Sequence, residues 1–134
     1  MGDTLFSMDK GKILIVEDDE FLREIYKETV ADLGNVVETA IDGEQALQKI
    51  PQGQYDLILL DIILPKVNGL DVIKKLKEQN TFPQKSKVIF LTNLDKDEEI
   101  KQALQLGDGY LIKSQLTPGD LSKEVNLFFA KRAS

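Results

Sequence analysis

The residues of this sequence that could do chemistry are carboxylates, hydroxyls and lysines. The 134-residue chain contains neither histidine nor cysteine, so imidazole bases, thiolate nucleophiles, disulfides and thiolate metal sites are all excluded. A small set of polar residues stands out because each one ends or directly follows a short apolar run. These residues are the acidic pair Glu17 and Asp18, then Asp61, Thr92 and Lys113.

Three carboxylates that meet at one edge of a sheet repel one another, and a divalent cation bound among them relieves that repulsion. Magnesium suits an all-oxygen site, because it uses one or two carboxylates, keeps waters and accepts a phosphoryl oxygen. A carboxylate beside magnesium can also attack phosphorus and form an acyl phosphate. Thr92 offers a hydroxyl donor and Lys113 a positive charge to the transferred group. The set therefore indicates magnesium-dependent phosphoryl transfer.

The elements that must position these groups alternate between short apolar strands and longer stretches of helical period. We predict strands over residues 12–16, 35–39, 55–61, 87–92 and 110–113. We predict helices over residues 21–33, 43–51, 70–78, 95–106 and 117–132, the second of them closed by Pro51. This alternation predicts an α/β fold, a doubly wound five-stranded parallel sheet with five helices in three α/β/α layers. Ligands of such sheets bind beyond the carboxyl ends of the strands, where the polar groups fall.

Length and composition limit what else the chain can be. At 134 residues it is expected to be one domain, with residues 1–11 a flexible lead-in, 12–132 the domain and 133–134 its end. The net charge of −6 would repel a nucleic-acid backbone, so we expect no direct nucleic-acid binding. The sequence has neither an apolar run long enough to span a membrane nor a signal peptide, so we expect no membrane contact and a cytoplasmic location.

From Lys12 to Arg132 the chain resembles the receiver domain of two-component response regulators, the CheY-like family. The resemblance rests on four motifs that occur in order and at family-like separations: ILIVEDD, LILLDIILPKVNG, FLT and GYLIK. Each motif alone is weak, but the four together are highly specific. The resemblance implies a flavodoxin-like sheet with strand order 2-1-3-4-5.

The resemblance also implies a metal site with Mg²⁺ as the cofactor. Asp61 would be the phosphoacceptor and a magnesium ligand, and Asp18 would be a second direct ligand. Glu17 would act on the metal mainly through water. The backbone carbonyl of Ile63, two residues past Asp61, would be a further ligand.

The implied function is a signalling switch. A sensor histidine kinase or a histidine phosphotransfer protein would supply the phosphoryl group, and the domain would catalyse its own phosphorylation and its slow loss rather than a metabolic reaction. Lys113 would pair with the phosphoryl group, Thr92 would be the switch hydroxyl that moves toward it, and Tyr110 the aromatic whose rotamer follows. The output would be a changed affinity for a downstream protein target, or for a second copy of the chain as a homodimer.

The sequence departs from the family pattern at two positions. Ser114 follows Lys113 where the family usually has proline, often after a cis bond, so we expect either a trans bond with a rearranged loop or a strained cis bond. Asn93 follows Thr92 where the family usually has a small residue, which narrows access to the site. The positions two past Asp61 and Thr92 are apolar, Ile63 and Leu94, and we hypothesise a long-lived phosphoryl group because neither side chain orients a water.

Other functions compete with this interpretation. A pseudo-receiver, an interaction module that works without phosphorylation, is opposed by the intact acidic set but left open by Ser114 and Asn93. A phosphohydrolase of the haloacid dehalogenase type would need a second Asp where Ile63 stands. A nucleotide-binding Rossmann domain would need a Gly-rich turn after the first strand, where this chain has EDDE. Asp18 or Asp19 could also do no more than cap the following helix.

Overall fold

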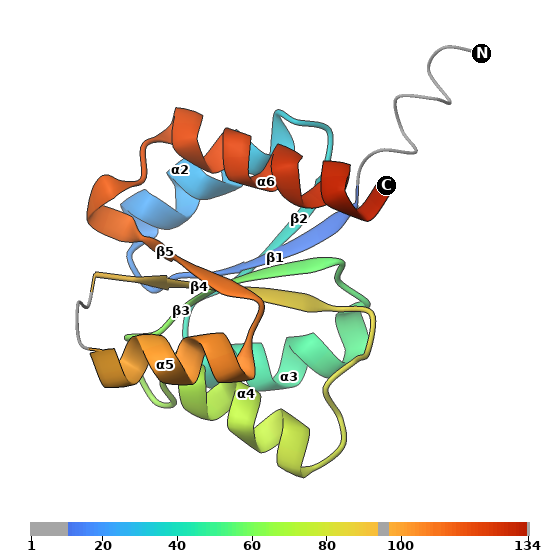
Figure 1. Ribbon diagram of the computed structural model, residues 1–134, viewed down its shortest axis with the longest axis vertical. Helices are drawn as coiled ribbons and strands as arrows, with labels where there is room; N and C mark the ends of the chain where they lie inside the picture. The colour runs from blue at the N-terminus through green and yellow to red at the C-terminus, as the bar shows by residue number, and fades with distance from the viewer. Residues whose placement is uncertain (1–10, 94–96, 134) are drawn as a thin grey trace.

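The computed structural model describes residues 11–93 and 97–133. Five strands and five α-helices alternate along this part of the chain (Figure 1). The strands are β1 (Lys12–Val16), β2 (Val36–Ala40), β3 (Leu57–Asp61), β4 (Lys87–Thr92) and β5 (Gly109–Ile112). The helices are α2 (Glu20–Ala31), α3 (Gly43–Gly53), α4 (Gly69–Glu78), α5 (Asp97–Leu106) and α6 (Pro118–Ala133), with a short 3₁₀ helix, η1 (Lys113–Gln115), after β5.

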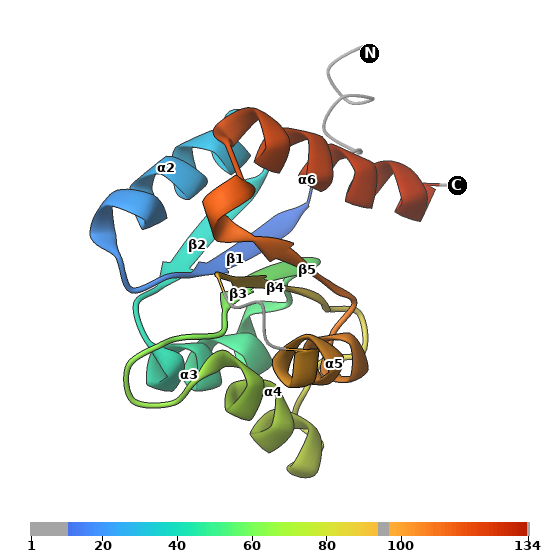
Figure 2. The same cartoon turned by 60° about the vertical axis from the view of Figure 1, so that its left-hand side comes forward.

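The strands form one parallel sheet in the order β2-β1-β3-β4-β5, which confirms the predicted fold class and strand order. Helices α2 and α6 cover one face of the sheet, and α3, α4 and α5 cover the other (Figures 1 and 2). Because β3 is central and carries helices on both faces, all five of its residues are buried. All five strands run in the same direction, so their carboxyl ends lie at one edge of the sheet.

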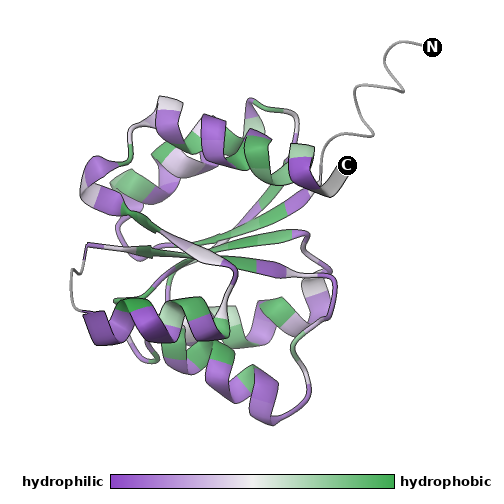
Figure 3. Cartoon of the chain, viewed as in Figure 1, coloured by the Kyte–Doolittle hydropathy of each residue, from purple (hydrophilic) through white to green (hydrophobic). Residues whose placement is uncertain are grey.

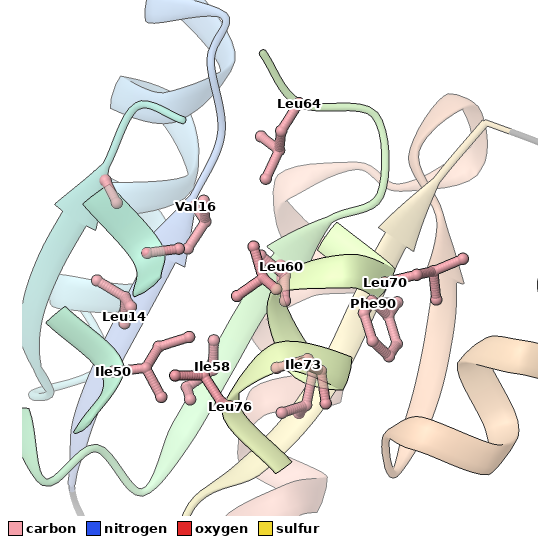
Figure 4. Packing of buried hydrophobic residues seen from close by; sticks show 14 of the residues in the cluster. Leu14, Val16, Ile50, Ile58, Leu60, Leu64, Leu70, Ile73, Leu76 and Phe90 are labelled. Carbon is pink, nitrogen blue, oxygen red and sulfur yellow. The ribbon is translucent and has the colours of Figure 1, made fainter. Parts of the chain in front are cut away.

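The core lies in two layers, one on each face of the sheet, because successive strand residues point to opposite faces. Leu14 and Leu60 belong to the layer under α3, α4 and α5, together with Ile50, Ile73 and other buried side chains (Figure 4). The layer under α2 and α6 contains the alternate strand residues, among them Ile13, Ile15, Leu57 and Leu59. The strands are accordingly hydrophobic while the helices carry polar residues on their outer sides (Figure 3).

Strands β1 and β4 have the predicted bounds, whereas the predicted stop of the second helix at Pro51 is wrong. Helix α3 continues through Pro51 to Gly53 and ends where Gln54 adopts a left-handed conformation with φ 54°. Proline breaks a helix by removing one backbone donor and by clashing with the preceding turn. Here only two helical residues follow it, so the lost hydrogen bond affects the last turn alone.

The second correction concerns Lys113, which was expected to end the fifth strand. Strand β5 runs from Gly109 to Ile112, and Lys113 instead begins η1. No cis peptide bond occurs among the described residues, so the Lys113–Ser114 bond is trans, the first of the two arrangements expected for this loop. The η1 turn is where the chain leaves the sheet toward α6.

Some predictions fall on residues outside the described ranges. These are the lead-in over residues 1–10, the position of Leu94 and the predicted start of the fourth helix at Asp95; α5 is described from Asp97. Among the described helices, none combines the length and the apolar character that crossing a membrane requires.

Candidate functional site

The carboxyl edge of the sheet brings the predicted polar residues of β1, β3 and β5 together. Glu17 directly follows β1, and its N–H donates to the Ala40 carbonyl at 3.1 Å, which extends the β1–β2 pairing by one residue. Asp61 is the last residue of the central strand β3. Lys113 directly follows β5 and reaches across the edge to both carboxylates. Three strand ends therefore contribute to one ionic cluster.

Lys113 bridges the two buried carboxylates. Its Nζ lies 2.7 Å from Oδ2 of Asp61 and 2.7 Å from Oε1 of Glu17. The side chains are 12%, 4% and 1% exposed for Lys113, Asp61 and Glu17, respectively. Ion pairs that are shielded from water in this way interact far more strongly than surface pairs, because solvent screens them less. The ammonium therefore compensates for the repulsion between two carboxylates at the sheet edge.

Burial sets the protonation behaviour of this cluster. Desolvation raises the pKa values of Glu17 and Asp61 above their ordinary range, and the Lys113 ammonium offsets only part of that rise. Burial alone would lower the pKa of Lys113, but its hydrogen bonds and charge interactions with Asp61 and Glu17 outweigh burial and raise it. Lys113 therefore stays positively charged, while burial disfavours the ionised forms of Glu17 and Asp61.

The acidic cluster has the composition of a site for a hard cation. Glu17, Asp18 and Asp61 each offer a carboxylate oxygen, and these oxygens lie within 4.8 Å of one another. Oε1 of Glu17 is buried and, apart from its ion pair with Lys113, has no hydrogen-bond partner among the described residues. Oxygen-only donor sets of this kind fit magnesium or calcium rather than zinc. The residues present thus fit the predicted magnesium ion.

Asp19, and not Asp18, is the residue that caps helix α2. The Asp19 carboxylate accepts from the Leu22 N–H at 2.9 Å, while its own N–H donates to Oε2 of Glu17 at 3.1 Å. Asp18 is exposed and belongs to the acidic cluster. Capping therefore explains Asp19 but does not explain Asp18, which favours the functional interpretation of the acidic pair.

The loop after β3 is held against the phosphoacceptor candidate. The N–H of Ile63 donates to Oδ1 of Asp61 at 3.3 Å, and the N–H of Gly69 donates to the Ile62 carbonyl at 2.8 Å. A Cβ at Gly69 would lie 2.2 Å from the Asp61 carbonyl oxygen, so only glycine allows α4 to begin this close to β3. The side chain of Ile63 points to solvent, with 60% of its surface exposed.

An open cleft of about 580 Å³ gives access to this cluster. Five of the predicted site residues line it: Glu17, Asp18, Asp61, Ile63 and Lys113. The cleft wall also contains Asp19, Leu22, Leu64, Pro65 and Asn93, and Asn93 is exposed there.

The two predicted switch residues are not among those that line the cleft. Thr92 ends β4 and is buried, one residue beyond the Asp61–Leu91 pair of the sheet register. Tyr110 on β5 is half-buried and packs against the core layer under α3, α4 and α5. Thr92 is paired with Ile112, and Tyr110 with Phe90, in the β4–β5 register. Their roles as switch residues stay predictions.

Sequence reasoning missed Arg23, which contacts the acidic pair through the backbone. Its Nη1 donates to the carbonyl oxygens of Glu17 at 3.1 Å and of Asp18 at 3.3 Å. The sequence did hold a signal: Arg23 follows the acidic pair by five and six positions, which places it in the first turn of the next helix, close to the pair. The signal is weak, because a lone arginine on a helix is ordinarily a solvated surface residue.

Comparison with known proteins establishes the family. The family model of the response regulator receiver domain matches residues 13–126, and the chain belongs to this family. The transcriptional regulatory protein DltR of Streptococcus agalactiae is 39% identical over 103 residues, which cover 76% of this chain and 45% of DltR. The transcriptional regulatory protein CrdR of Helicobacter pylori is 33% identical over 118 residues, or 88% of this chain and 54% of CrdR. The chain spans about half the length of the curated relatives it matches.

Solved structures support the same conclusion. The receiver domain of the Francisella response regulator 1452 superposes with a TM-score of 0.77 at 31% identity, covering 92% of this chain and 99% of that domain. The chemotaxis response regulator CheY4 of Vibrio cholerae superposes with a TM-score of 0.76 at 28% identity, covering 87% of this chain and 96% of CheY4. The chain is thus a receiver domain of the two-component response regulators, with the CheY-like fold.

Proposed function

We propose that the domain accepts a phosphoryl group on Asp61 from a phosphohistidine of a sensor histidine kinase or a histidine phosphotransfer protein. The observation that carries this proposal is the bridge of Lys113 between Asp61 and Glu17, beside Asp18, in one open cleft. The arrangement combines a nucleophile, a fixed positive charge and a set of oxygen ligands within reach of a bound phosphoryl group. The sequence contains no histidine, so the donor phosphohistidine lies outside these 134 residues.

Magnesium is the proposed cofactor. Asp18, Asp61 and the backbone carbonyl of Ile63 would hold it, with Glu17 acting mainly through water. The bound cation would neutralise the acidic cluster and the charge of the incoming phosphoryl oxygens. Two buried carboxylates beside one exposed carboxylate are unfavourable without added positive charge, and this supports the assignment.

The transfer step requires little rearrangement of the chain. A carboxylate oxygen of Asp61 attacks phosphorus, forming an O–P bond while the P–N bond to the donor imidazole breaks, and the leaving imidazole takes up a proton from solvent. Lys113 keeps its charge throughout and moves its ammonium contact from Oδ2 of Asp61 to a phosphoryl oxygen. Hydrolysis later returns Asp61 to the free carboxylate and releases inorganic phosphate.

Phosphorylation would then shift a two-state equilibrium of the domain. We propose that Thr92 moves toward the phosphoryl group and that Tyr110 follows, which alters the surface of β5 and its neighbouring helices. The readout would be a changed affinity for a downstream protein or for a second copy of the chain. The relatives DltR and CrdR are named as transcriptional regulatory proteins. We propose that any nucleic-acid contact lies outside this negatively charged domain.

Mass measurement after incubation with magnesium and acetyl phosphate tests the proposal. Asp61→Asn keeps the shape of the side chain and removes the nucleophile, so it is the matched control. We expect one added phosphoryl group on the natural sequence, and none with Asp61→Asn or with magnesium chelated. Absence of labelling under conditions that label another receiver domain would contradict the proposal and favour the phosphorylation-independent pseudo-receiver.

A further inference from the structure

Arg23 contacts the backbone at the rim of the acidic cluster. A single guanidinium nitrogen, Nη1, donates to two successive backbone carbonyls, that of Glu17 at 3.1 Å and that of Asp18 at 3.3 Å. Arg23 is half-buried and lies at the end of the first turn of α2. Both acceptors belong to the residues whose carboxylates form two thirds of the acidic cluster.

Arg23 does not stabilise helix α2 through its position in the helix. A positive charge in the first turn is unfavourable, because the N-terminus of a helix carries the positive end of its dipole. The favourable choices for this turn, an acidic cap at Asp19 and an acidic residue at Glu20, are already present. The guanidinium is instead used to hold the turn that connects β1 to α2.

Two further hydrogen bonds tie this turn to the same residues. The N–H of Asp19 donates to Oε2 of Glu17 at 3.1 Å, and the Asp19 carboxylate accepts from the Leu22 N–H at 2.9 Å. These two bonds restrain the side chain of Glu17 and the start of α2. Arg23 adds the restraint that they lack, because it fixes the peptide units of Glu17 and Asp18 themselves. The direction of the exposed Asp18 carboxylate depends on those peptide units.

We propose that Arg23 is a positioning residue for divalent-cation binding: its guanidinium clamps the carbonyls of Glu17 and Asp18 so that their carboxylates stay converged on Asp61. Without the clamp, repulsion among the three carboxylates would open the turn between β1 and α2. Part of the binding free energy of a cation would then be needed to close the turn, so the cation would bind more weakly. This inference rests on the proposed function, because it assumes that the acidic cluster binds magnesium.

Magnesium titration of the whole chain, followed by the shifts of backbone amide resonances, tests the inference. We expect Arg23→Ala to weaken magnesium binding about five- to tenfold, the loss that corresponds to one hydrogen bond of ordinary strength. Arg23→Lys keeps the charge but replaces the rigid, planar guanidinium with a shorter, flexible ammonium side chain, so it should recover part of the affinity. The matched control is Lys27→Ala, one helical turn further along α2, where the charge is exposed and contacts neither carbonyl.

The thermal unfolding midpoint of each variant, measured with magnesium chelated, separates positioning from general stabilisation. Weaker binding in Arg23→Ala, partial recovery in Arg23→Lys and unchanged binding in Lys27→Ala would support the clamp. Equal weakening by Arg23→Ala and Lys27→Ala would overturn it, because the effect would then not depend on the contacts of Arg23 with the two carbonyls. A lower midpoint with unchanged magnesium affinity would also overturn it. If Arg23→Ala does not fold, Arg23→Lys decides, because a magnesium affinity equal to that of the natural sequence would show that the guanidinium contact is not needed.

The natural sequence distinguishes failure of the inference from failure of the proposed function. If the natural sequence binds magnesium and Arg23→Ala binds it equally well, the inference alone is wrong. If the natural sequence does not bind magnesium at all, the proposed function is wrong and the inference is overturned with it.

Discussion

Replacing Lys113 with methionine should destabilise the metal-free domain more than replacing any surface lysine. Methionine keeps much of the apolar stem of lysine but removes the ammonium that lies 2.7 Å from both Asp61 and Glu17. The two carboxylates are almost fully buried, so they would remain side by side without a counter-charge. Breaking a buried ion pair by removing one partner costs about 3–5 kcal/mol.

We expect the lower end of that range, about 3 kcal/mol of unfolding free energy, for Lys113→Met. The raised pKa values of Asp61 and Glu17 allow one of them to take up a proton and relieve part of the repulsion. For a domain of this length the loss corresponds to a fall in the unfolding midpoint of about 10 °C. Chemical denaturation at pH 7 with magnesium chelated, followed by circular dichroism, measures it directly.

Lys74→Met is the matched control for this measurement. Lys74 forms an exposed ion pair with Asp71 at 3.9 Å on helix α4, and such surface pairs contribute at most about 1 kcal/mol. Magnesium should restore part of the stability lost in Lys113→Met, because a bound cation replaces the missing charge. A loss for Lys113→Met no larger than that for Lys74→Met would refute the argument that the cluster depends on a shielded counter-charge.

Three other predictions follow from the same geometry. Asp61→Asn should stabilise the metal-free domain relative to the natural sequence at pH 7. The folded-state pKa of Asp61 is raised above 3.8, so the natural sequence loses stability as pH rises through that raised value. The stability advantage of Asp61→Asn should therefore shrink when unfolding is repeated near pH 4. A stability advantage of Asp61→Asn that grows toward pH 4 would contradict the raised pKa of Asp61. Gly69→Ala should cost about 2–4 kcal/mol of unfolding free energy, because its Cβ would lie 2.2 Å from the Asp61 carbonyl oxygen. A loss below about 1 kcal/mol, measured by calorimetry, would be inconsistent with that close approach. Replacing both Ile63 and Leu94 with asparagine should speed phosphate release from the phosphorylated domain, since polar side chains can orient an attacking water. Equal or slower release, measured with radiolabelled phosphate, would show that these side chains do not set the lifetime.

The strands were predictable because they are short apolar runs covered by helices on both faces. LILLD of β3 and KILIV of β1 are apolar almost throughout, and the two strands pair with each other in the interior of the sheet. The third strand was predicted to begin two residues too early, at Tyr55 instead of Leu57, and the less apolar segments have errors of one or two residues. The stop at Pro51 was misjudged because the rule against proline applies to helix interiors, and this proline lies in the last turn.

The candidate site was predictable to the extent that strand ends determine it. Parallel strands put Glu17, Asp61 and Lys113 at one edge whatever the details of the loops, and the structure brings all three into contact. The division of labour between Asp18 and Asp19 was not predictable, because either carboxylate could cap α2. The contact of Arg23 with two carbonyls was missed for a similar reason, since it depends on the conformation of the turn rather than on residue type.

The measurement that tests the central claim most directly is to locate the acyl phosphate along the chain. Borohydride reduces an aspartyl phosphate to homoserine, which marks the phosphorylated residue permanently for peptide mass spectrometry. After incubation with magnesium and acetyl phosphate, we predict that homoserine appears at Asp61 and that chelation of magnesium abolishes it. Homoserine at Asp18 or Asp19 instead, or labelling that persists without a divalent cation, would contradict the account.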